Sequence, residues 1–417
     1  MKSPDQIVPE ALNLFSGESN ENPFAVFAKM REMNAVIPIP FPMGGPNVQA
    51  WMVTRMEESM QVLKDHVQFT VDPSSIGGSN DYREGLAGDD PTAPPTFFTG
   101  KSMLFVDEPD HRRLRVLVSK AFTPRYMESL RPRIQEIADE LLDQVQDQGQ
   151  MDLVKDYAYP LPINVICEML GVPQADRSQI HIWSGTLAHG LGLGRKEPEV
   201  EESLRAFGEY TAQLVDNKRK NPADDLISQL IAIEEEGDRL SIDELVSMIT
   251  LLIFAGHETT SNLIATGSMM LLDHPEQLDK LKSNLSLVPA AIEELLRFNG
   301  PSTIAGPRFA TSDIELGGQL IKKGEIVIPV LKSANRDESQ FSQSEELDVT
   351  RKINRHLAFG HGIHMCLGAP LARVEADIAF TTLLKRLPNL RLNIPHEDVQ
   401  WNFTLSSQGL DSLPVAF

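Results

Sequence analysis

The sequence predicts a mainly α-helical fold with small β-sheets, built as a single domain over residues 1–417. Three observations favour this fold class. Apolar residues recur three and four positions apart along most of the chain, which is the period of a helix with one buried face. Alternation with a period of two, which is typical of strands, is confined to short stretches. No linker divides the chain, although 417 residues would by length alone suggest two or three domains.

Segments with helical spacing cover most of the chain. They are residues 23–33, 56–65, 111–122, 126–146, 161–170, 199–220, 242–272, 290–297 and 367–387. The predicted strands are residues 50–54, 313–316, 326–329 and the C-terminal end.

Residues 72–101 are dense in glycine, proline, serine and aspartate. This stretch is much longer than ordinary loops of about 4 to 6 residues. A linker here would leave only about seventy residues before it, which is a marginal size for a domain. We therefore predict that the stretch is a functional lid.

Composition and charge exclude several classes of function. The formal net charge of −21 disfavours nucleic acid and anionic membrane as partners. Residues 1–23 are polar and acidic and lack the apolar stretch of a signal peptide or membrane anchor, so we expect a soluble, cytoplasmic protein. We also expect a monomer. The two cysteines, Cys167 and Cys366, provide neither a disulfide framework nor a paired-cysteine zinc site.

Residues 111–125 contrast with this acidic background. They carry five basic residues and no acidic one: Arg112, Arg113, Arg115, Lys120 and Arg125. The segment is either a solvated helix face or a patch that binds an acidic partner.

Cys366 lies in a glycine-rich loop, Phe359-Gly-His-Gly-Ile-His-Met-Cys-Leu-Gly368, just before the predicted helix 367–387. Glycines let the backbone pass close to a flat ligand, and the free amides of a helix N-terminus stabilise a thiolate. A single cysteine can instead be a small buried hydrophobe. The flanking pattern favours a ligand.

The predicted helix 242–272 is apolar but is interrupted at Ala255-Gly-His-Glu-Thr259. Gly256 weakens the helix there, so a local bend or groove is expected. A carboxylate such as Glu258 is costly in a buried helix unless it is paired, hydrated or protonated. Glu258 therefore has either a functional role or a place in a structural ion pair. Further along, Glu294 and Arg297 lie three apart on one helix face, an arrangement that alone says little.

Together, in this order and spacing, these elements resemble the signature set of the cytochrome P450 superfamily, in its soluble bacterial branch. The resemblance covers nearly the whole chain and is carried by the interrupted helix, Glu294-Leu-Leu-Arg297, Arg308, Arg351 and the loop of Cys366. It implies a helix-rich triangular prism with haem b buried between a long central helix and the cysteine loop.

The resemblance implies that Cys366 is the axial thiolate ligand of the haem iron, which favours cleavage of bound dioxygen. Its other implied cofactor-binding residues are His111, Arg115, Arg308, His364, Phe359 and Ala255. Basic side chains among them would bind the two haem propionates. Glu258 and Thr259 match the acid and alcohol that deliver protons at the oxygen site. Glu294, Arg297 and Arg351 match a buried triad that braces the cysteine loop.

The implied activity is insertion of one oxygen atom from O2 into a lipophilic small molecule, by hydroxylation or epoxidation. A separate ferredoxin or flavodoxin with its reductase would supply two electrons, docking near Arg112, Arg113 and Lys120. The candidate substrate-binding residues are Phe97, Phe98, Leu104, Met248, Leu252, Ile304 and Ala305, although each could simply pack the core. Fatty acids, steroids, terpenoids and polyketides all fit such an apolar pocket. A peroxide-driven peroxygenase and a haem sensor without turnover are the alternative functions.

Overall fold

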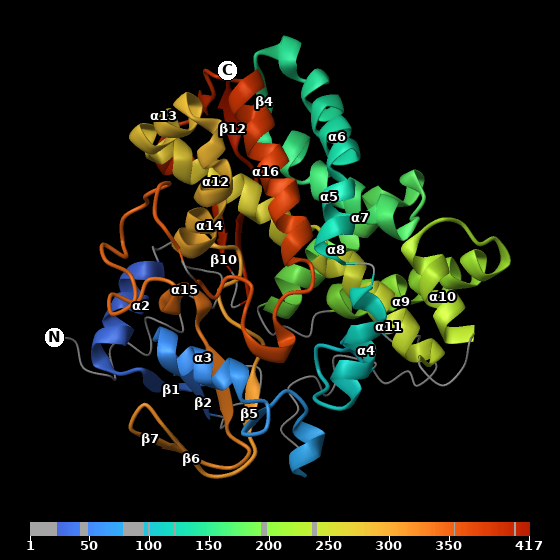
Figure 1. Ribbon diagram of the computed structural model, residues 1–417, viewed down its shortest axis with the longest axis vertical. Helices are drawn as coiled ribbons and strands as arrows, with labels where there is room; N and C mark the ends of the chain where they lie inside the picture. Colours follow the sequence, from blue (N-terminus) through green and yellow to red (C-terminus); the bar gives the residue numbers. More distant parts are fainter. Residues whose placement is uncertain are drawn as a thin grey trace.

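The computed structural model describes residues 23–41, 49–77, 96–98, 101–120, 122–192, 198–235, 240–353, 355–403 and 406–417. Helices make up most of the molecule, and the largest sheet lies at one end of it, beneath α3 (Figure 1). Most of the predicted lid, residues 78–95 and 99–100, lies outside the described residues. Of the helices that are described, none is long and apolar enough to span a membrane.

The largest sheet joins two distant parts of the sequence. Its strand order is β1 (Val36–Pro40), β2 (Gln49–Val53), β8 (Ile326–Pro329), β5 (Arg308–Ala310) and β3 (Phe69–Thr70). Strands β2 and β8 are parallel, with Ala50 opposite Ile326, and the other pairs are antiparallel. Because residues from the first and last thirds share this sheet, we propose that the chain forms one domain.

Three smaller sheets complete the strands of the described residues. They are β4 (Gln150–Asp152) with β12 (Pro414–Ala416) and β9 (Arg391–Leu392); β10 (Trp401–Phe403) with β11 (Gln408–Leu410); and β6 (Ile314–Leu316) with β7 (Gln319–Ile321). The predicted strands correspond to β2, β6, β8 and β12.

The helices agree with the predicted class. They are α2 (Pro23–Met33), α3 (Met56–Lys64), α4 (Asp110–Ser119), α5 (Pro124–Ser129), α6 (Arg131–Asp143), α7 (Pro160–Leu170), α8 (Arg177–Gly192), α9 (Pro198–Lys220), α10 (Leu226–Glu235), α11 (Ile242–Ala255), α12 (Glu258–Asp273), α13 (Pro275–Ser283), α14 (Val288–Asn299), α15 (Leu331–Ala334) and α16 (Ala369–Arg386).

Two predicted helices are each divided in two. The segment 126–146 forms α5 and α6, because Pro132 has no amide hydrogen and occupies the first turn of a new helix. The segment 242–272 forms α11 and α12, which are separated at Gly256 and His257. This break is the bend that the sequence predicted.

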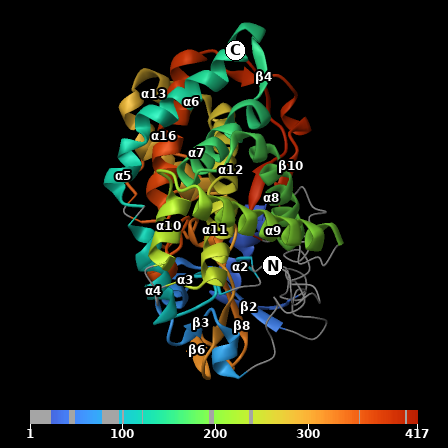
Figure 2. The same cartoon turned by 90° about the vertical axis from the view of Figure 1, so that its right-hand side faces the viewer.

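The largest hydrophobic core lies among the helices. It is formed by α6, α7, α9, α11, α12 and α16, and α12 packs against both α7 and α16 (Figure 2). A separate apolar cluster lies between α2 and the large sheet. The interrupted helix is thus fixed on several sides, and its break lies within the helical core.

Candidate functional site

The loop of Cys366 is shaped by two glycines with left-handed backbone conformations. Gly360 and Gly362 have φ of 70° and 74°, a region that L-residues with a side chain rarely adopt. A Cβ at Gly362 would lie 2.2 Å from the carbonyl oxygen of Leu63, so the loop passes directly against α3. The amide of Cys366 donates to the carbonyl oxygen of Phe359 at 2.9 Å and closes the loop.

Cys366 has an accessible side chain in dense surroundings. The residue is exposed, yet burial raises the pKa of its thiol, while the amides of Gly368 and Ala369 and the guanidinium of Arg115 lower the pKa. Both observations agree when the thiol borders an internal space rather than bulk water. The net pKa shift is upward, so the helix N-terminus alone does not make this thiol a thiolate, and a bound cation would be needed.

A cluster of basic side chains lies beside this loop. His111 and Arg115 come from α4, Arg308 from β5 and His364 from the loop itself. The rings of His111 and His364 are 4.3 Å apart between centroids, and Arg115 donates to the carbonyl oxygen of Met365 at 2.6 Å. Arg308 is buried and donates to the carbonyl oxygen of Gly306 at 2.7 Å. The charge of Arg308 acts on His364, so the structure brings together all four residues that the resemblance assigns to the propionates.

The basic cluster is electrostatically unbalanced. Burial, helped by the charges of His364 and Arg115, lowers the pKa of His111 to about 4. Neither ring nitrogen of His111, although buried, has a hydrogen-bond partner among the described residues. Buried polar atoms are rarely left without a partner, so an anionic ligand fits here.

Asp107 belongs to this site but was not identified from the sequence. Its carboxylate lies 3.5 Å from Nε2 of His364 and accepts hydrogen bonds from the Thr70 hydroxyl and, at 3.1 Å, from the Val71 amide. These contacts tie the cysteine loop to β3. The only signal in the sequence is its position, one helical turn before His111.

The break between α11 and α12 exposes selected side chains of an otherwise buried helix pair. Ala255 and Thr259 are exposed, whereas the side chains of Met248 and Leu252 are buried. A Cβ at Gly256 would lie 2.6 Å from Cγ1 of Ile166 on α7, so the glycine permits close packing. The break therefore presents a small residue and a hydroxyl to open space.

Glu258, next to Thr259, is held as a neutral acid. Burial raises the pKa of Glu258 to about 8 because an ionised carboxylate loses hydration there. No hydrogen bond or ion pair to its carboxyl is found within the part of the chain that the structure describes. At neutral pH the group carries a proton that it can donate.

Glu294 and Arg297 are buried and form a triad with the half-buried Arg351. Arg297 donates from Nε and Nη2 to the two carboxylate oxygens of Glu294 at 2.7 and 2.8 Å, and Arg351 donates from Nε at 3.1 Å. Arg297 also donates to the carbonyl oxygen of Asn335 at 3.1 Å, and the Asn335 side chain accepts from the Leu357 amide at 2.6 Å. The triad is thus connected to the chain that leads into the cysteine loop.

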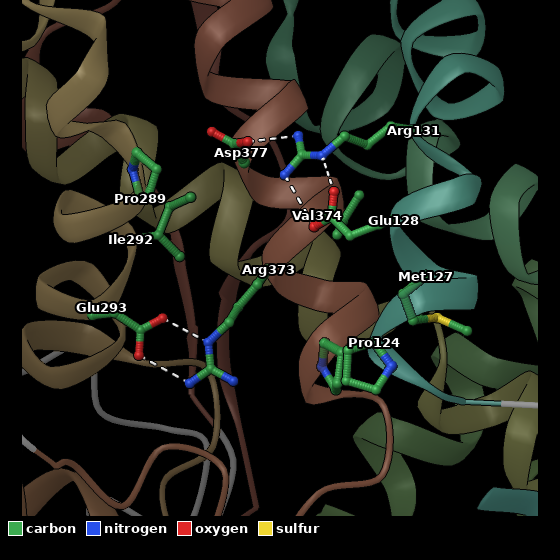
Figure 3. Close-up of a pocket in the computed structure, with 11 residues that line it drawn as sticks. Pro124, Met127, Glu128, Arg131, Pro289, Ile292, Glu293, Arg373, Val374 and Asp377 are labelled. Carbon is green, nitrogen blue, oxygen red and sulfur yellow. Dashed lines mark hydrogen bonds and ion pairs between the residues drawn. The ribbon is translucent and has the colours of Figure 1, made fainter. Parts of the chain in front are cut away.

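A second brace lies between α14 and α16, beside a pocket of about 310 Å³ (Figure 3). Glu293 accepts two hydrogen bonds from Arg373 at 2.7 and 2.9 Å. The guanidinium of Arg373 lies 4.5 Å from the ring centroid of Phe359. This pair supports Phe359, the residue at the start of the cysteine loop.

The apolar candidates differ in exposure. Phe97 is buried and stacks on Phe98 and Phe254, with centroids 4.3 and 4.8 Å apart. The side chain of Ser247 on α11 donates to the carbonyl oxygen of Thr96 at 3.1 Å, which fixes this part of the predicted lid. Met248 and Leu252 are buried as well, whereas Phe98, Ile304 and Ala305 are half-buried and Leu104 is exposed.

One candidate for partner docking is also bonded within the chain. Arg113, whose side chain is 33% exposed, donates to Glu244 on α11 at 2.5 and 3.1 Å and to Asp110 at 2.9 Å. It therefore attaches α4 to α11. Arg112 and Lys120 remain exposed.

These residues fit haem b. The orphaned nitrogens of His111 and the neighbouring cations suit two propionates, and the accessible thiol of Cys366 suits an iron ligand. Ala255 and Thr259 border open space as a flat cofactor and a bound substrate require.

Comparisons with known proteins agree with this fit to haem b. Residues 193–410 match the cytochrome P450 family. Cytochrome P450 CYP107DY1 of Priestia megaterium is 47% identical over 88% of this chain and 90% of its own. The polyketide biosynthesis cytochrome P450 PksS of Bacillus subtilis is 40% identical over 96% of each chain. The crystal structure of myxobacterial CYP267B1 with myristic acid superposes with a TM-score of 0.89 at 40% identity, covering 97% of this chain and 98% of the other. The chain therefore belongs to the cytochrome P450 family and is a monooxygenase with haem b as its cofactor.

Proposed function

We propose that the protein hydroxylates or epoxidises a lipophilic molecule with an extended aliphatic part, such as a fatty acid or a polyketide. Support comes from the apolar aromatic group formed by Phe97, Phe98 and Phe254 next to the break in the central helix. PksS is named for polyketide biosynthesis, and CYP267B1 was solved with myristic acid. A spectroscopic screen for haem spin-state shifts, with fatty acids, polyketides, steroids and terpenoids compared, tests the class. Shifts confined to steroids or terpenoids would overturn it.

Haem b, when bound, supplies oxygen binding and one-electron chemistry. Cys366 would hold the iron, and His111, Arg115, Arg308 and His364 would hold the propionates. The triad of Glu294, Arg297 and Arg351 would keep the cysteine loop in place.

We infer that Glu258 and Thr259 deliver protons at the oxygen site. The observation that carries this inference is the neutral, unpaired acid beside an exposed hydroxyl at the helix break. Thr259 donates only a long hydrogen bond, 3.4 Å, to the carbonyl oxygen of Ala255, so its hydroxyl can turn toward a water or an oxygen ligand.

The variant Thr259→Ala tests this role. It should still consume O2 but release more of it as hydrogen peroxide, because protons reach the oxygen site less well. Product and peroxide are measured per O2 consumed. A fully coupled Thr259→Ala would contradict the role.

Electrons would come from a ferredoxin or flavodoxin that docks near the cysteine loop. The exposed cations Arg112 and Lys120, with the exposed apolar side chains of Val116 and Met365, would form the docking surface. Charge reversal at Arg112 and Lys120 should slow reduction, most strongly at low salt. Unchanged reduction rates at all salt concentrations would exclude this surface.

The alternative functions are separated by one experiment. A monooxygenase forms product with O2 and a ferredoxin or flavodoxin system, a peroxygenase only with added peroxide, and a sensor under neither condition.

A further inference from the structure

Tyr159 is a buried polar residue that the proposed chemistry has not used. It follows the π-helical turn Val154–Ala158 and precedes α7, and both of these elements contact α12. Its hydroxyl is buried without a hydrogen-bond partner among the described residues. Buried tyrosine hydroxyls normally have a hydrogen-bond partner. The Tyr159 hydroxyl therefore needs either a bound water or a small reorientation toward a neighbouring side chain.

Glu258 is the natural acceptor. Burial raises the pKa of Tyr159, and the nearby Cys167 thiol and Glu258 carboxyl raise this pKa further. The Tyr159 ring lies 5.5 Å from the ring of His257, the residue directly before Glu258, so the two groups belong to one neighbourhood. Each lacks a partner in the described chain, and one can donate a hydrogen bond to the other.

His181 connects this pair to solvent. It lies on α8, is exposed, and packs against the Tyr159 ring with centroids 3.8 Å apart. Burial of part of the ring lowers the pKa of His181, and an imidazole can take up a proton on one ring nitrogen while it releases one from the other.

The other titratable groups near Tyr159 cannot replace His181 as its proton donor. His257 lies edge-on to Tyr159, 5.5 Å between centroids, but its Nδ1 is bonded to the carbonyl oxygen of Ile253 at 2.8 Å. Burial lowers the pKa of His257 to about 4, so it stays neutral. Burial raises the pKa of the Cys167 thiol to about 12, so it stays protonated.

We propose that protons reach Glu258 from solvent through His181 and Tyr159, with the Tyr159 hydroxyl hydrogen-bonded to the Glu258 carboxyl directly or through one water. Each proton that leaves Glu258 is replaced by the hydroxyl proton of Tyr159. Tyr159 takes one in turn from His181 or from water held by it, and His181 is reprotonated by solvent. The net change is one proton taken from solvent, and no electron moves. This route rests on the proton-delivery role proposed for Glu258.

The hydrogen bond is tested without turnover. Infrared difference spectra of the holoenzyme, recorded across a pH titration, contain the carbonyl band of protonated Glu258, which Glu258→Gln identifies by removing it. Tyr159→Phe should shift this band to higher frequency, because a carbonyl that loses a hydrogen bond vibrates faster. The matched control is Tyr157→Phe, since the Tyr157 hydroxyl donates to the carbonyl oxygen of Ala379 at 3.1 Å and is bonded elsewhere. A band that Tyr159→Phe leaves in place would overturn the proposal.

The relay is tested in turnover. Tyr159→Phe and His181→Gln should each raise the peroxide formed per O2 by about tenfold and increase the solvent isotope effect on product formation. The exposed neighbour Ile182, changed to alanine, is the control and should alter neither. Should Tyr159→Phe fail to fold, His181→Gln decides the route, and full coupling in that variant would overturn it. If Glu258→Gln itself stays coupled, the proposed role of Glu258 fails, whereas a band shift in Tyr159→Phe would still establish the hydrogen bond.

Discussion

Replacing Glu258 with glutamine should stabilise the protein at neutral pH. The ordinary pKa of a glutamate carboxyl is 4.5, and burial raises the pKa of Glu258 to about 8 in the folded chain. Between these values the unfolded state releases a proton that the folded state keeps. Raising the pH through this window therefore favours unfolding of the wild type, whereas below pH 4.5 both states are protonated and the group has no effect.

The size of the effect follows from the same shift. Each pKa unit corresponds to about 1.4 kcal/mol, so at pH 7 the carboxyl costs the folded state about 3 kcal/mol. Glutamine cannot ionise and avoids this cost. Water in the space beside Thr259 would solvate part of the charge, so about 3 kcal/mol is the upper end of the expected gain.

The assay is urea unfolding of the holoenzyme, followed by circular dichroism at pH 5, 6 and 7. The difference in unfolding free energy between Glu258→Gln and the wild type should grow with pH, and groups unchanged in both proteins cancel. A difference that stays flat from pH 5 to 7 would show that Glu258 is already ionised in the folded protein, and the reasoning would fail.

Glu293→Gln is the matched control because its shift has the opposite sign. Burial raises the pKa of Glu293, but hydrogen bonds from Arg373 and His356 outweigh this and lower it to about 2. A carboxyl whose pKa is lowered by folding stabilises the folded state above pH 4.5, and this stabilisation is lost only in acid. Glu293→Gln should therefore be less stable than the wild type by an amount that is constant from pH 5 to 7.

Three further changes test other parts of the site. Arg297→Lys loses the paired contact with Glu294 and leaves buried carbonyl oxygens without donors. Chemical unfolding should therefore show a free energy of unfolding that is lower by about 3 kcal/mol, and an unchanged unfolding midpoint would refute the brace. Gly362→Ala forces a side chain against the carbonyl oxygen of Leu63 at positive φ, so the purified protein should retain less haem by its Soret absorbance, whereas full retention would refute the tight loop. Burial raises the pKa of the carboxyl of Glu375 well above 4.5, an effect only partly opposed by Thr260, so Glu375→Gln should gain stability over the wild type between pH 5 and 8 in urea titrations, and a loss at pH 8 would contradict this.

The sequence predicted those helices whose apolar residues recur with a clear helical period. The segments that form α2, α9 and α14 were located to within a few residues, because each has a regular apolar face. Helix α8 was missed, since its apolar residues alternate with glycine and small polar residues, and packing on α9 supplies its stability. Strand β5 was missed for a similar reason: three residues carry little pattern, and its partners are β3 and β8.

The site was predictable only as far as residue types reveal chemistry. The four propionate candidates came from the family resemblance, and the structure places them together. Charge counting did not reveal the ion pair of Arg113, because its partner Glu244 lies 131 residues away and only the fold joins them. Tyr159 and His181 gave no signal, since a buried hydroxyl without a partner is a property of the packing.

The propionate side of the site, around His111, and the iron side, at Cys366, each carry an electrostatic cost, and the cofactor would relieve both. On one side, burial and the charges of His364 and Arg115 disfavour a positive charge on His111, whose ring nitrogens have no hydrogen-bond partner among the described residues. On the other, burial raises the pKa of Cys366, so its thiol resists becoming an anion. Propionates supply the missing negative charge, and iron stabilises the thiolate. Because these costs are largest in the folded chain without its ligand, haem binding contributes directly to stability, and the loop around Cys366 should be the part of the fold that depends on it most.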